Sequence, residues 1–141
     1  MKTLWGQNHL IATRLTGTRS DNAPITFDID LSGQPCTKRA EGAKKGYFAG
    51  EKKHRYGGQL ARVAAWETQE ILVESLYPGN TTSKAVFKEM VLKIDDWLSQ
   101  VPPSERRWIR LRMDAGLGTF ANINFALSRG YQILAKVYSS K

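Results

Sequence analysis

Three strand-like runs occupy the first half of the chain. Residues 25–31, which follow Pro24, are rich in β-forming residues, and residues 59–66 and 70–77 have the same character. Because only a short connection separates the last two runs, we expect them to form an antiparallel pair. Residues 34–56 are rich in Gly and Lys and show no helical periodicity, so we predict a loop or an irregular hairpin there.

The clearest helix lies in the second half of the chain. Apolar residues recur at the three- and four-residue spacing of one helical face, with Ser83 as the expected N-cap and Pro102 and Pro103 ending the helix. The residues of this face are Val86, Phe87, Met90, Val91, Ile94, Trp97 and Leu98. We predict that they belong to the core.

A strand, a short helix and a final strand follow. Residues 107–114 alternate between apolar and polar, which is typical of a strand. A Gly-containing turn then leads to a helix over 120–128, with Thr119 or a neighbouring residue as its N-cap. Gly130 follows the helix at a position where a left-handed residue is favoured. Residues 131–138 complete the pattern as a strand.

The order strand, strand, strand, helix, strand, helix, strand predicts an α/β fold with one mixed sheet. We expect antiparallel pairing among the leading strands and parallel neighbours where helices cross over. Such a sheet is complete only when helices cover both faces, and two helices leave it one helix short. We divide the chain into a poorly specified lead-in over 1–23, with one short element near 10–15, and a domain over 24–141.

The composition fits one folded domain with a polyanionic partner. The 141 residues are 41% hydrophobic and 24% charged, which is enough for one core. Lys and Arg number 21 against 13 Asp and Glu, so the net charge is +8, which favours nucleic acid over a membrane as partner. The single cysteine, Cys36, excludes an internal disulfide and a multi-thiolate zinc site. No apolar run is long enough to span a membrane, so we expect a soluble, cytoplasmic protein.

Three aspartates stand where a sheet would bring carboxylates together. Asp28 and Asp30 are two residues apart in an apolar strand and therefore share a face of the sheet. Asp114 ends the later strand, and the carboxyl ends of parallel strands meet at one edge. Paired carboxylates are the hard ligands that Mg²⁺ or Mn²⁺ takes. The structural alternatives are that one of the first two caps a turn at Ser32 and that Asp114 is an ordinary turn residue.

The predicted loop carries most of the excess positive charge. Between residues 34 and 56, seven basic residues oppose two glutamates, a net charge of +5. Aromatic residues are interleaved with these charges, which suits contact with phosphates and stacking on bases. The alternative is an ordinary solvated surface. The candidate DNA-binding residues are Lys38, Arg39, Lys44, Lys45, Tyr47, Lys52, Lys53 and Arg55.

Five short segments, in this order, resemble the catalytic domain of insertion-sequence transposases of the DDE type, which has a ribonuclease-H-like fold. They are Phe-Asp-Ile-Asp-Leu-Ser-Gly, Glu-Gly-Ala-Lys-Lys-Gly-Tyr, Leu-Tyr-Pro-Gly-Asn-Thr, Arg-Leu-Arg-Met-Asp-Ala-Gly-Leu-Gly and Arg-Gly-Tyr-Gln-Ile-Leu-Ala-Lys. The resemblance extends from about residue 25 to the C-terminus. The strand order of the family also agrees with the order predicted above.

The resemblance implies two of the three acidic residues that this family uses. Its first acid ends the first strand in an Asp-x-Ser/Thr context, which Asp30 fits best and Asp28 fits as the alternative. Its second acid lies in an Arg-x-Asp-x-Gly context, which Asp114 matches. By resemblance, these residues would bind Mg²⁺ or Mn²⁺ and take part in cleavage and strand transfer of DNA at transposon ends.

The third acid of the family is a glutamate on a later helix, and no residue of this sequence takes that role. Residues 1–23 are also too few for the N-terminal DNA-end-binding region of the family. We therefore expect a C-terminally truncated fragment with little or no transposition activity alone. The alternatives are a non-catalytic DNA-binding remnant and an unrelated basic interaction protein. A sheet lacking its later helices would expose apolar surface, which favours a homodimer or aggregation.

Overall fold

The computed structural model describes residues 11, 15, 23–46, 48, 53–114 and 116–136. The strands are β1 (Ile25–Pro35), β2 (Lys44–Gly46), β3 (Arg55–Ala65), β4 (Glu70–Pro78), β5 (Ile109–Met113) and β6 (Gln132–Ala135). The helices are α2 (Ser83–Trp97) and α3 (Phe120–Ser128), with a 3₁₀ helix η1 (Pro103–Trp108) between them. No helix in these ranges is long and apolar enough to cross a membrane.

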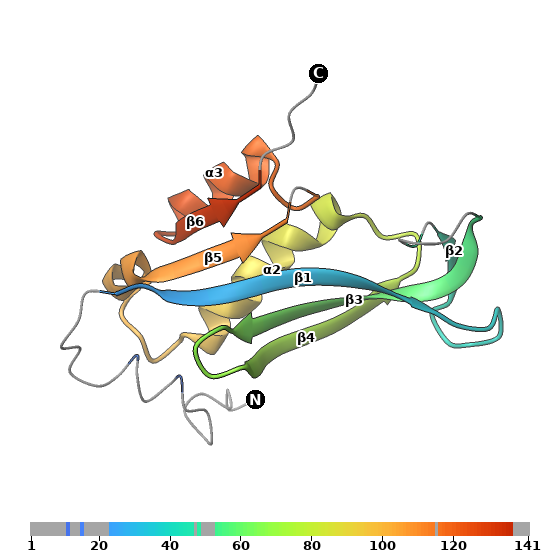
Figure 1. The fold of residues 1–141 in the computed structure, drawn as a ribbon, viewed down its shortest axis with the longest axis horizontal. Coiled ribbons are helices and arrows are strands. Elements are labelled where there is room, and N and C mark those ends of the chain that lie inside the picture. Colours follow the sequence, from blue (N-terminus) through green and yellow to red (C-terminus); the bar gives the residue numbers. More distant parts are fainter. Residues whose placement is uncertain are drawn as a thin grey trace.

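The described strands form one mixed sheet (Figure 1). Its order is β2-β3-β1-β5-β6, and β4 also pairs with β3. The strand β3 runs antiparallel to β1, β2 and β4, whereas β5 lies parallel to β1 and β6 lies parallel to β5. The predicted mixed α/β fold, with antiparallel leading strands followed by helix-strand-helix-strand, is confirmed.

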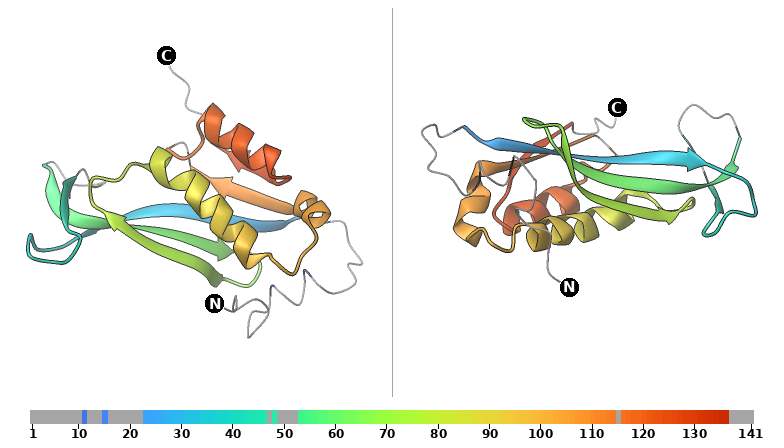
Figure 2. Two further views of the ribbon diagram at one scale, coloured as in Figure 1. Left: turned by 180° about the vertical axis from the view of Figure 1, so that it is seen from behind. Right: turned by 90° about the horizontal axis from the view of Figure 1, so that it is seen from below.

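Both helices and η1 lie on the same face of the sheet (Figure 2). On the central strand β1, the side chains of Ile25, Phe27 and Ile29 are buried on this side, whereas Asp30 is exposed on the other. No helix of the described ranges covers that second face, which we call the open face and which is turned toward the viewer in Figure 1. Its acidic residues are therefore accessible from solvent.

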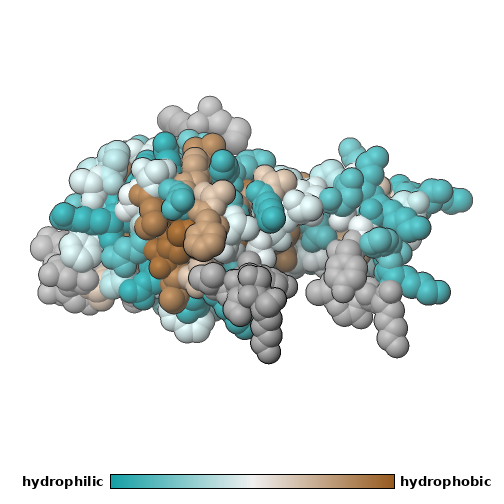
Figure 3. Space-filling view, turned by 90° about the horizontal axis from the view of Figure 1, so that it is seen from above, coloured by the Kyte–Doolittle hydropathy of each residue, from teal (hydrophilic) through white to brown (hydrophobic). Residues whose placement is uncertain are grey.

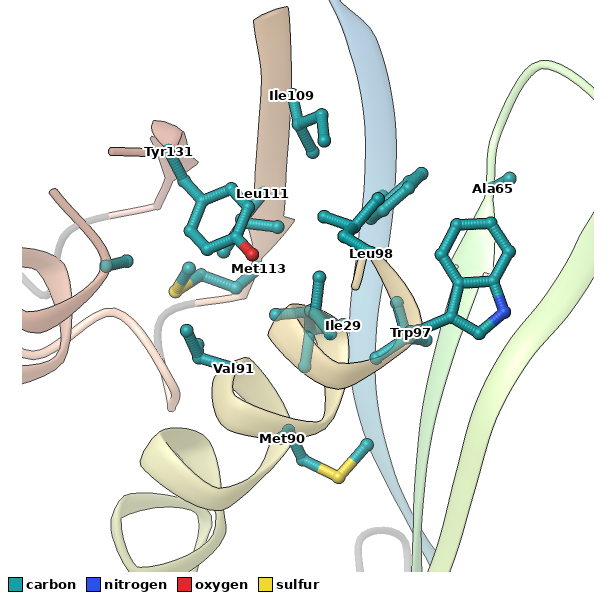
Figure 4. Close-up of a cluster of buried hydrophobic side chains, with 14 of the residues drawn as sticks. Ile29, Ala65, Met90, Val91, Trp97, Leu98, Ile109, Leu111, Met113 and Tyr131 are labelled. Carbon is teal, nitrogen blue, oxygen red and sulfur yellow. The ribbon is translucent and has the colours of Figure 1, made fainter. Parts of the chain in front are cut away.

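The core fills the space between the sheet and α2. All seven apolar residues predicted for this helix face, from Val86 to Leu98, are buried. Figure 4 shows Met90 and Trp97 of this helix close to Ile29 on β1. The rings of Phe27 and Trp97 meet edge to face, with centroids 6.0 Å apart. The helical periodicity of the sequence therefore identified the main core contact.

Of the loop or irregular hairpin predicted over 34–56, the structure shows the hairpin, because β1 and β3 pair antiparallel as far as Pro35 opposite Gly57. The strand β1 continues to Pro35, β2 adds three residues, and β3 begins at Arg55 rather than at residue 59. Residues 34–46 and 53–58 thus extend the sheet beyond the helices, and we call this extension the basic arm. Glycine-rich stretches have little strand propensity of their own, so pairing such as Gln34 with Gly58 depends on the neighbouring strand.

Helix and strand boundaries in the second half shift by a few residues. The expected N-cap Ser83 is wrong: it is the first helical residue, and the N-cap is Thr82, whose side chain makes no capping hydrogen bond. The helix α2 ends at Trp97, before the prolines. Pro103 begins η1, which takes residues 107 and 108 out of the predicted strand because proline suits a helical first turn.

The short helix α3 has the predicted bounds and ends. Thr119 is its N-cap and accepts a hydrogen bond of 3.3 Å from the backbone N–H of Asn122. Gly130 has a φ of +94°, the left-handed conformation that was predicted. In the lead-in, the helical residues Ile11 and Leu15 pack on the core, and the rest of 1–22 lies outside the described residues, as does the end of the predicted strand 131–138.

Candidate functional site

The strands β1 and β5 carry the candidate acidic residues. Their parallel register ends with Asp28 opposite Arg112. Asp30 lies two residues further along β1, and Asp114 directly follows β5, also two residues further along. The register therefore puts Asp30 and Asp114 at equivalent positions, each two residues past the last paired residue of β1 and β5. These two strands lie side by side in Figure 1.

Asp28 forms a two-point ion pair with Arg112 on the open face. The Nε of Arg112 donates to one carboxylate oxygen, and its Nη2 donates to the other at 2.8 Å. This hydrogen bonding raises the pKa of Arg112 further above its usual value. About a third of each side chain remains exposed (31% for Asp28 and 37% for Arg112). Because the guanidinium satisfies both carboxylate oxygens, Asp28 is the weaker candidate for a metal ligand.

Asp30 presents an exposed carboxylate on the same face. Its Oδ2 accepts a hydrogen bond of 2.7 Å from the hydroxyl of Ser32. The proposed turn at Ser32 does not exist, because β1 continues through it, so this contact links two residues on one face of a strand. In register, Asp30 faces Arg62 of β3, whose Nε donates to Glu74 at 2.8 Å.

Asp114 lies in the turn that follows β5. Its Oδ1 accepts from the backbone N–H of Leu117 at 3.2 Å, and its carbonyl oxygen accepts from Gly118 at 3.0 Å. A Cβ added at Gly116 would lie 3.4 Å from Oδ1 and 3.5 Å from the hydroxyl of Ser83, so the carboxylate is close to the start of α2. Asp114 therefore does have the role in a turn that was the structural alternative. The hydrogen bond from Leu117 also orients its exposed carboxylate.

The donor set at the ends of β1 and β5 fits a hard divalent cation in part. Carboxylate oxygens from Asp30 and Asp114 are the type of ligand that Mg²⁺ and Mn²⁺ take, with water or phosphate completing the coordination. Within the described ranges, no group of three or more His, Cys, Asp or Glu is placed to hold a metal ion. Two protein carboxylates would thus leave much of the coordination shell to solvent and substrate.

The basic arm carries six of the eight candidate DNA-binding residues in described, exposed positions. These are Lys38, Arg39, Lys44, Lys45, Lys53 and Arg55, whereas Tyr47 and Lys52 lie outside the described residues. The Nζ of Lys38 lies 5.8 Å from the centroid of the Tyr56 ring. Figure 3 shows hydrophilic side chains gathered at this end of the molecule. The arm therefore presents a concentrated positive charge.

Close glycine contacts hold the arm against the turn before α2. A Cβ on Gly46 would lie 2.0 Å from the carbonyl oxygen of Gly79, and a Cβ on Gly79 would lie 2.3 Å from that of Gly57. Only glycine permits backbones to approach so closely. A cavity of about 540 Å³ lies next to these contacts and is lined by residues that include Lys45 and Asn80.

Sequence reasoning missed Trp66, which lies directly after β3 on the open face. The guanidinium carbon of Arg112 lies 4.7 Å from the centroid of the Trp66 ring, and 54% of this tryptophan is exposed. The backbone N–H of Trp66 donates to the carbonyl oxygen of Thr26 at 2.9 Å. The available signal was strand alternation, since Trp66 lies four residues, or two strand periods, after Arg62 and is therefore assigned to the same open face.

The fold is similar to transposases of known structure. The piggyBac transposase synaptic complex with hairpin DNA, solved by cryo-EM, matches with a TM-score of 0.58 and 14% identity, over 84% of this chain and 24% of that chain. The crystal structure of a pre-cleavage Mos1 transpososome matches with a TM-score of 0.50 and 12% identity, over 82% of this chain and 36% of that chain. The crystal structure of the Mos1 mariner paired end complex with Mn matches with a TM-score of 0.50 and 12% identity, over 77% and 35%.

These likenesses show a transposase-like fold of the ribonuclease-H-like type. The chain spans between 24% and 36% of the length of these three structural neighbours. No family model matches the chain, and no curated protein sequence matches it.

Proposed function

We propose that this chain is part of the catalytic domain of a DDE-type insertion-sequence transposase. In this proposal, Asp30 and Asp114 bind Mg²⁺ or Mn²⁺, and the basic arm contacts the DNA of transposon ends. The observation that supports it most is the parallel register of β1 and β5 within a transposase-like fold, which puts two carboxylates at equivalent strand positions. Ligand sites in open α/β sheets lie beyond the carboxyl ends of parallel strands.

The chain's own residues contribute charge and orientation to this site. The hydroxyl of Ser32 orients the carboxylate of Asp30, and the N–H of Leu117 orients that of Asp114. A divalent ion bound there would supply Lewis-acid activation of a water or 3′-hydroxyl and would stabilise the leaving oxygen. Because the described residues provide no group of three acidic ligands, we expect nicking of DNA rather than complete transposition from this chain alone.

The basic arm would bind the phosphate backbone. Its exposed cations lie at one end of the sheet, on and around β2 and the start of β3, and Tyr56 beside Lys38 offers a ring for stacking. Binding of this kind is sensitive to salt, because each neutralised phosphate releases condensed counterions. Replacing Lys38, Arg39, Lys44 and Lys45 together by Ala should weaken duplex binding. It should also flatten the log–log salt dependence by about 0.9 for each phosphate that is no longer neutralised. The control is Lys136→Ala, after β6.

The second candidate function is DNA binding without catalysis. It is favoured by the hydrogen bond that engages Asp114 with its own turn, as expected of an ordinary turn residue. In this case the chain would bind duplex DNA through the basic arm and would leave it intact with Mn²⁺ present. The two candidates therefore share the DNA-binding result and differ in cleavage.

Nicking of supercoiled plasmid in the presence of Mn²⁺ distinguishes the two. We expect nicking by the wild-type chain and its loss in Asp30→Ala and Asp114→Ala. Asp96→Ala, an exposed aspartate on α2, should nick as the wild type does. Binding without nicking would support the non-catalytic function, and nicking that survives both substitutions would show that the site assignment is wrong.

A homodimer is also part of the proposal, and an apolar patch supports it. Phe120 and Leu127 on α3 and Leu134 on β6 are 78%, 52% and 49% exposed. Figure 3 shows apolar side chains gathered over these elements. Such patches favour association. Sedimentation velocity of the wild type and of Phe120→Ser should give a dimer and a monomer; a wild-type monomer at all concentrations would contradict this part.

A further inference from the structure

The ion pair of Asp28 and Arg112 has no role in the proposed metal site. They are the last paired residues in the parallel register of β1 and β5, and each stands two residues before a proposed ligand. A two-residue step along a strand returns to the same face about 7 Å further on. The pair is therefore the last contact between β1 and β5 before Asp30 and Asp114 on the open face.

The ion pair of Asp28 and Arg112 is bidentate and therefore restricts how β1 and β5 can move relative to each other. Both nitrogens of the planar guanidinium edge meet both oxygens of one carboxylate, which sets the orientation as well as the separation of the two side chains. A shift of β5 along β1 would break both hydrogen bonds together. The pair thus opposes the sliding motion that would move Asp114 away from Asp30.

Trp66 holds the guanidinium from the third strand. Its ring centroid lies 4.7 Å from the guanidinium carbon of Arg112, and its backbone N–H is bonded to Thr26 of β1. A stacked guanidinium keeps its edge available for hydrogen bonds in one plane. Through these contacts, the end of β3, the strand β1 and the strand β5 are joined on the open face beside the proposed ligands.

The charges of this cluster suit a neighbouring cation site. The positive charge of Arg112 is neutralised by Asp28, so the pair adds no net charge next to Asp30 and Asp114. If Asp28 were instead a ligand, Arg112 would lose its partner and bring an unpaired positive charge close to the metal. The electrostatics therefore favour Asp28 as the partner of the arginine and not as a ligand.

We infer that Asp28, Arg112 and Trp66 form a positioning unit that aligns Asp30 and Asp114 for one divalent ion. The inference rests on the proposed metal site and adds to it the residues that set its geometry. It changes the role of Asp28 from alternative metal ligand to positioning residue. It also gives the exposed Trp66 a function that a core or turn residue would not have.

The test is the affinity of the full chain for Mn²⁺, measured by titration with electron paramagnetic resonance detection of the free ion. Arg112→Lys keeps the charge and loses the two-point geometry, so we expect its Kd to rise by about tenfold or more, as for other residues that orient metal ligands. Asp28→Asn should show a similar rise. Trp66→Leu, which keeps the ion pair and loses only the ring stacked on Arg112, should show a smaller rise of about two- to fivefold. Arg110→Lys, on the same strand and face, is the matched control and should bind as the wild type does.

Thermal unfolding of the same variants separates positioning from stability. We expect midpoints close to the wild type for Arg112→Lys and Trp66→Leu, because the side chains are partly exposed. Wild-type affinity in both Arg112→Lys and Asp28→Asn would overturn the inference and leave the metal site standing. Loss of binding in Asp28→Asn as complete as in Asp30→Ala, with Arg112→Lys unaffected, would also overturn it, since Asp28 would then be a ligand. If Mn²⁺ does not bind the wild type, or binds it equally well after Asp30→Ala, the proposed site and the inference are both wrong.

Discussion

Within the described part of the chain, two clusters pair an aspartate with arginine, one on each side of the sheet. On the helix side, the carboxylate of Asp95 in α2 is only 8% exposed. On the open face, the carboxylate of Asp28 is 31% exposed. The same kind of ion pair is thus buried on one side of the sheet and partly exposed on the other. An unpaired charge costs more free energy on the buried side.

The cluster around Asp95 joins α2 to the elements that follow it. Arg129 donates from Nε to Asp95 Oδ2 at 2.8 Å, the hydroxyl of Tyr131 donates to Oδ1, and Nη2 of Arg106 lies 3.6 Å from Oδ1. The guanidinium carbon of Arg106 also lies 5.7 Å from the centroid of the Tyr131 ring. These contacts connect α2 with η1 and with the segment between α3 and β6.

This difference in burial indicates that the cluster around Asp95 supports the fold, whereas the pair of Asp28 and Arg112 positions other residues. A buried carboxylate with three donors cannot lose its charge without leaving those donors unsatisfied, so it supports the fold. In the pair of Asp28 and Arg112, about a third of each side chain is exposed, so water can replace either partner. The pair therefore contributes little to stability. What it can still provide is geometry, which matters where two ligands must face one ion.

The largest expected effect is that of Asp95→Ala on stability. The substitution leaves Arg129 without the acceptor of its two hydrogen bonds and the largely buried Arg106 without its ion-pair partner, so we expect a loss of about 3–5 kcal/mol in the free energy of unfolding. Urea denaturation followed by circular dichroism measures it. Asp96→Ala, the adjacent exposed aspartate, should change the midpoint little. Equal effects of the two substitutions would remove the distinction between the clusters.

Tyr131→Phe should have the next largest effect and should depend on pH. Removing a hydroxyl that donates to a charged acceptor should cost about 1.5–3 kcal/mol at neutral pH. Burial, and then the hydrogen bond to Asp95, raise the pKa of Tyr131 above its usual value of 10.0.

Because the raised pKa of Tyr131 favours the protonated phenol in the folded state, its stabilising contribution is complete below pH 10 and is lost as the pH rises above it. The wild type should therefore lose stability more steeply above pH 10 than Tyr131→Phe does. Tyr77, whose pKa burial raises to about 12, is present in both proteins and cancels in this comparison. Equal slopes in urea titrations at several alkaline pH values would contradict the role given to Tyr131.

On the open face, Asp28→Asn should cost no more than about 1 kcal/mol of stability. The reason is that water reaches both partners of the ion pair. The same urea denaturation measures this value, and addition of NaCl to about 0.5 M should reduce the difference from the wild type further. A loss as large as that of Asp95→Ala would mean that the open face is covered in solution.

The smallest effect is expected for Arg62→Ala, next to Asp30. Its ion pair with Glu74 has side chains that are 44% and 46% exposed, so its removal should cost about 0.2–1 kcal/mol. A double-mutant cycle with Glu74→Ala measures the coupling between the two side chains. A coupling well above this range would place Arg62 in the same class as the buried cluster.

Local sequence signals predicted much of the fold. The helix α3 has the predicted bounds because Thr119 and Gly130 mark its ends through contacts within a few residues. The six buried apolar residues of α2 and its C-cap Leu98 were identified for the same reason, since a helical face repeats over short distances. The strands of the basic arm could be predicted only as a loop or an irregular hairpin, because their stability comes from pairing with a neighbouring strand.

Around the three aspartates, the sequence indicated the acidic residues but not their partners. The two-residue spacing of Asp28 and Asp30, and the position of Asp114 before a turn, could be read from the chain. The partner of Asp28 could not, because Arg112 lies 84 residues away and the pairing depends on the register of two strands. The contact between Trp66 and Arg112 could not be predicted either, because it also joins residues that are far apart in the sequence. The same holds for the cluster around Asp95, which joins three elements.

Localisation of Mn²⁺ by NMR tests the central claim most directly. A bound paramagnetic ion broadens the amide signals of the residues close to it. The account predicts that substoichiometric Mn²⁺ broadens Asp30, Ser32, Asp114 and Gly116 first, at the shared end of β1 and β5. Broadening that begins elsewhere, for example at Asp95 on the helix side, or that persists at these residues in Asp30→Ala, would contradict it.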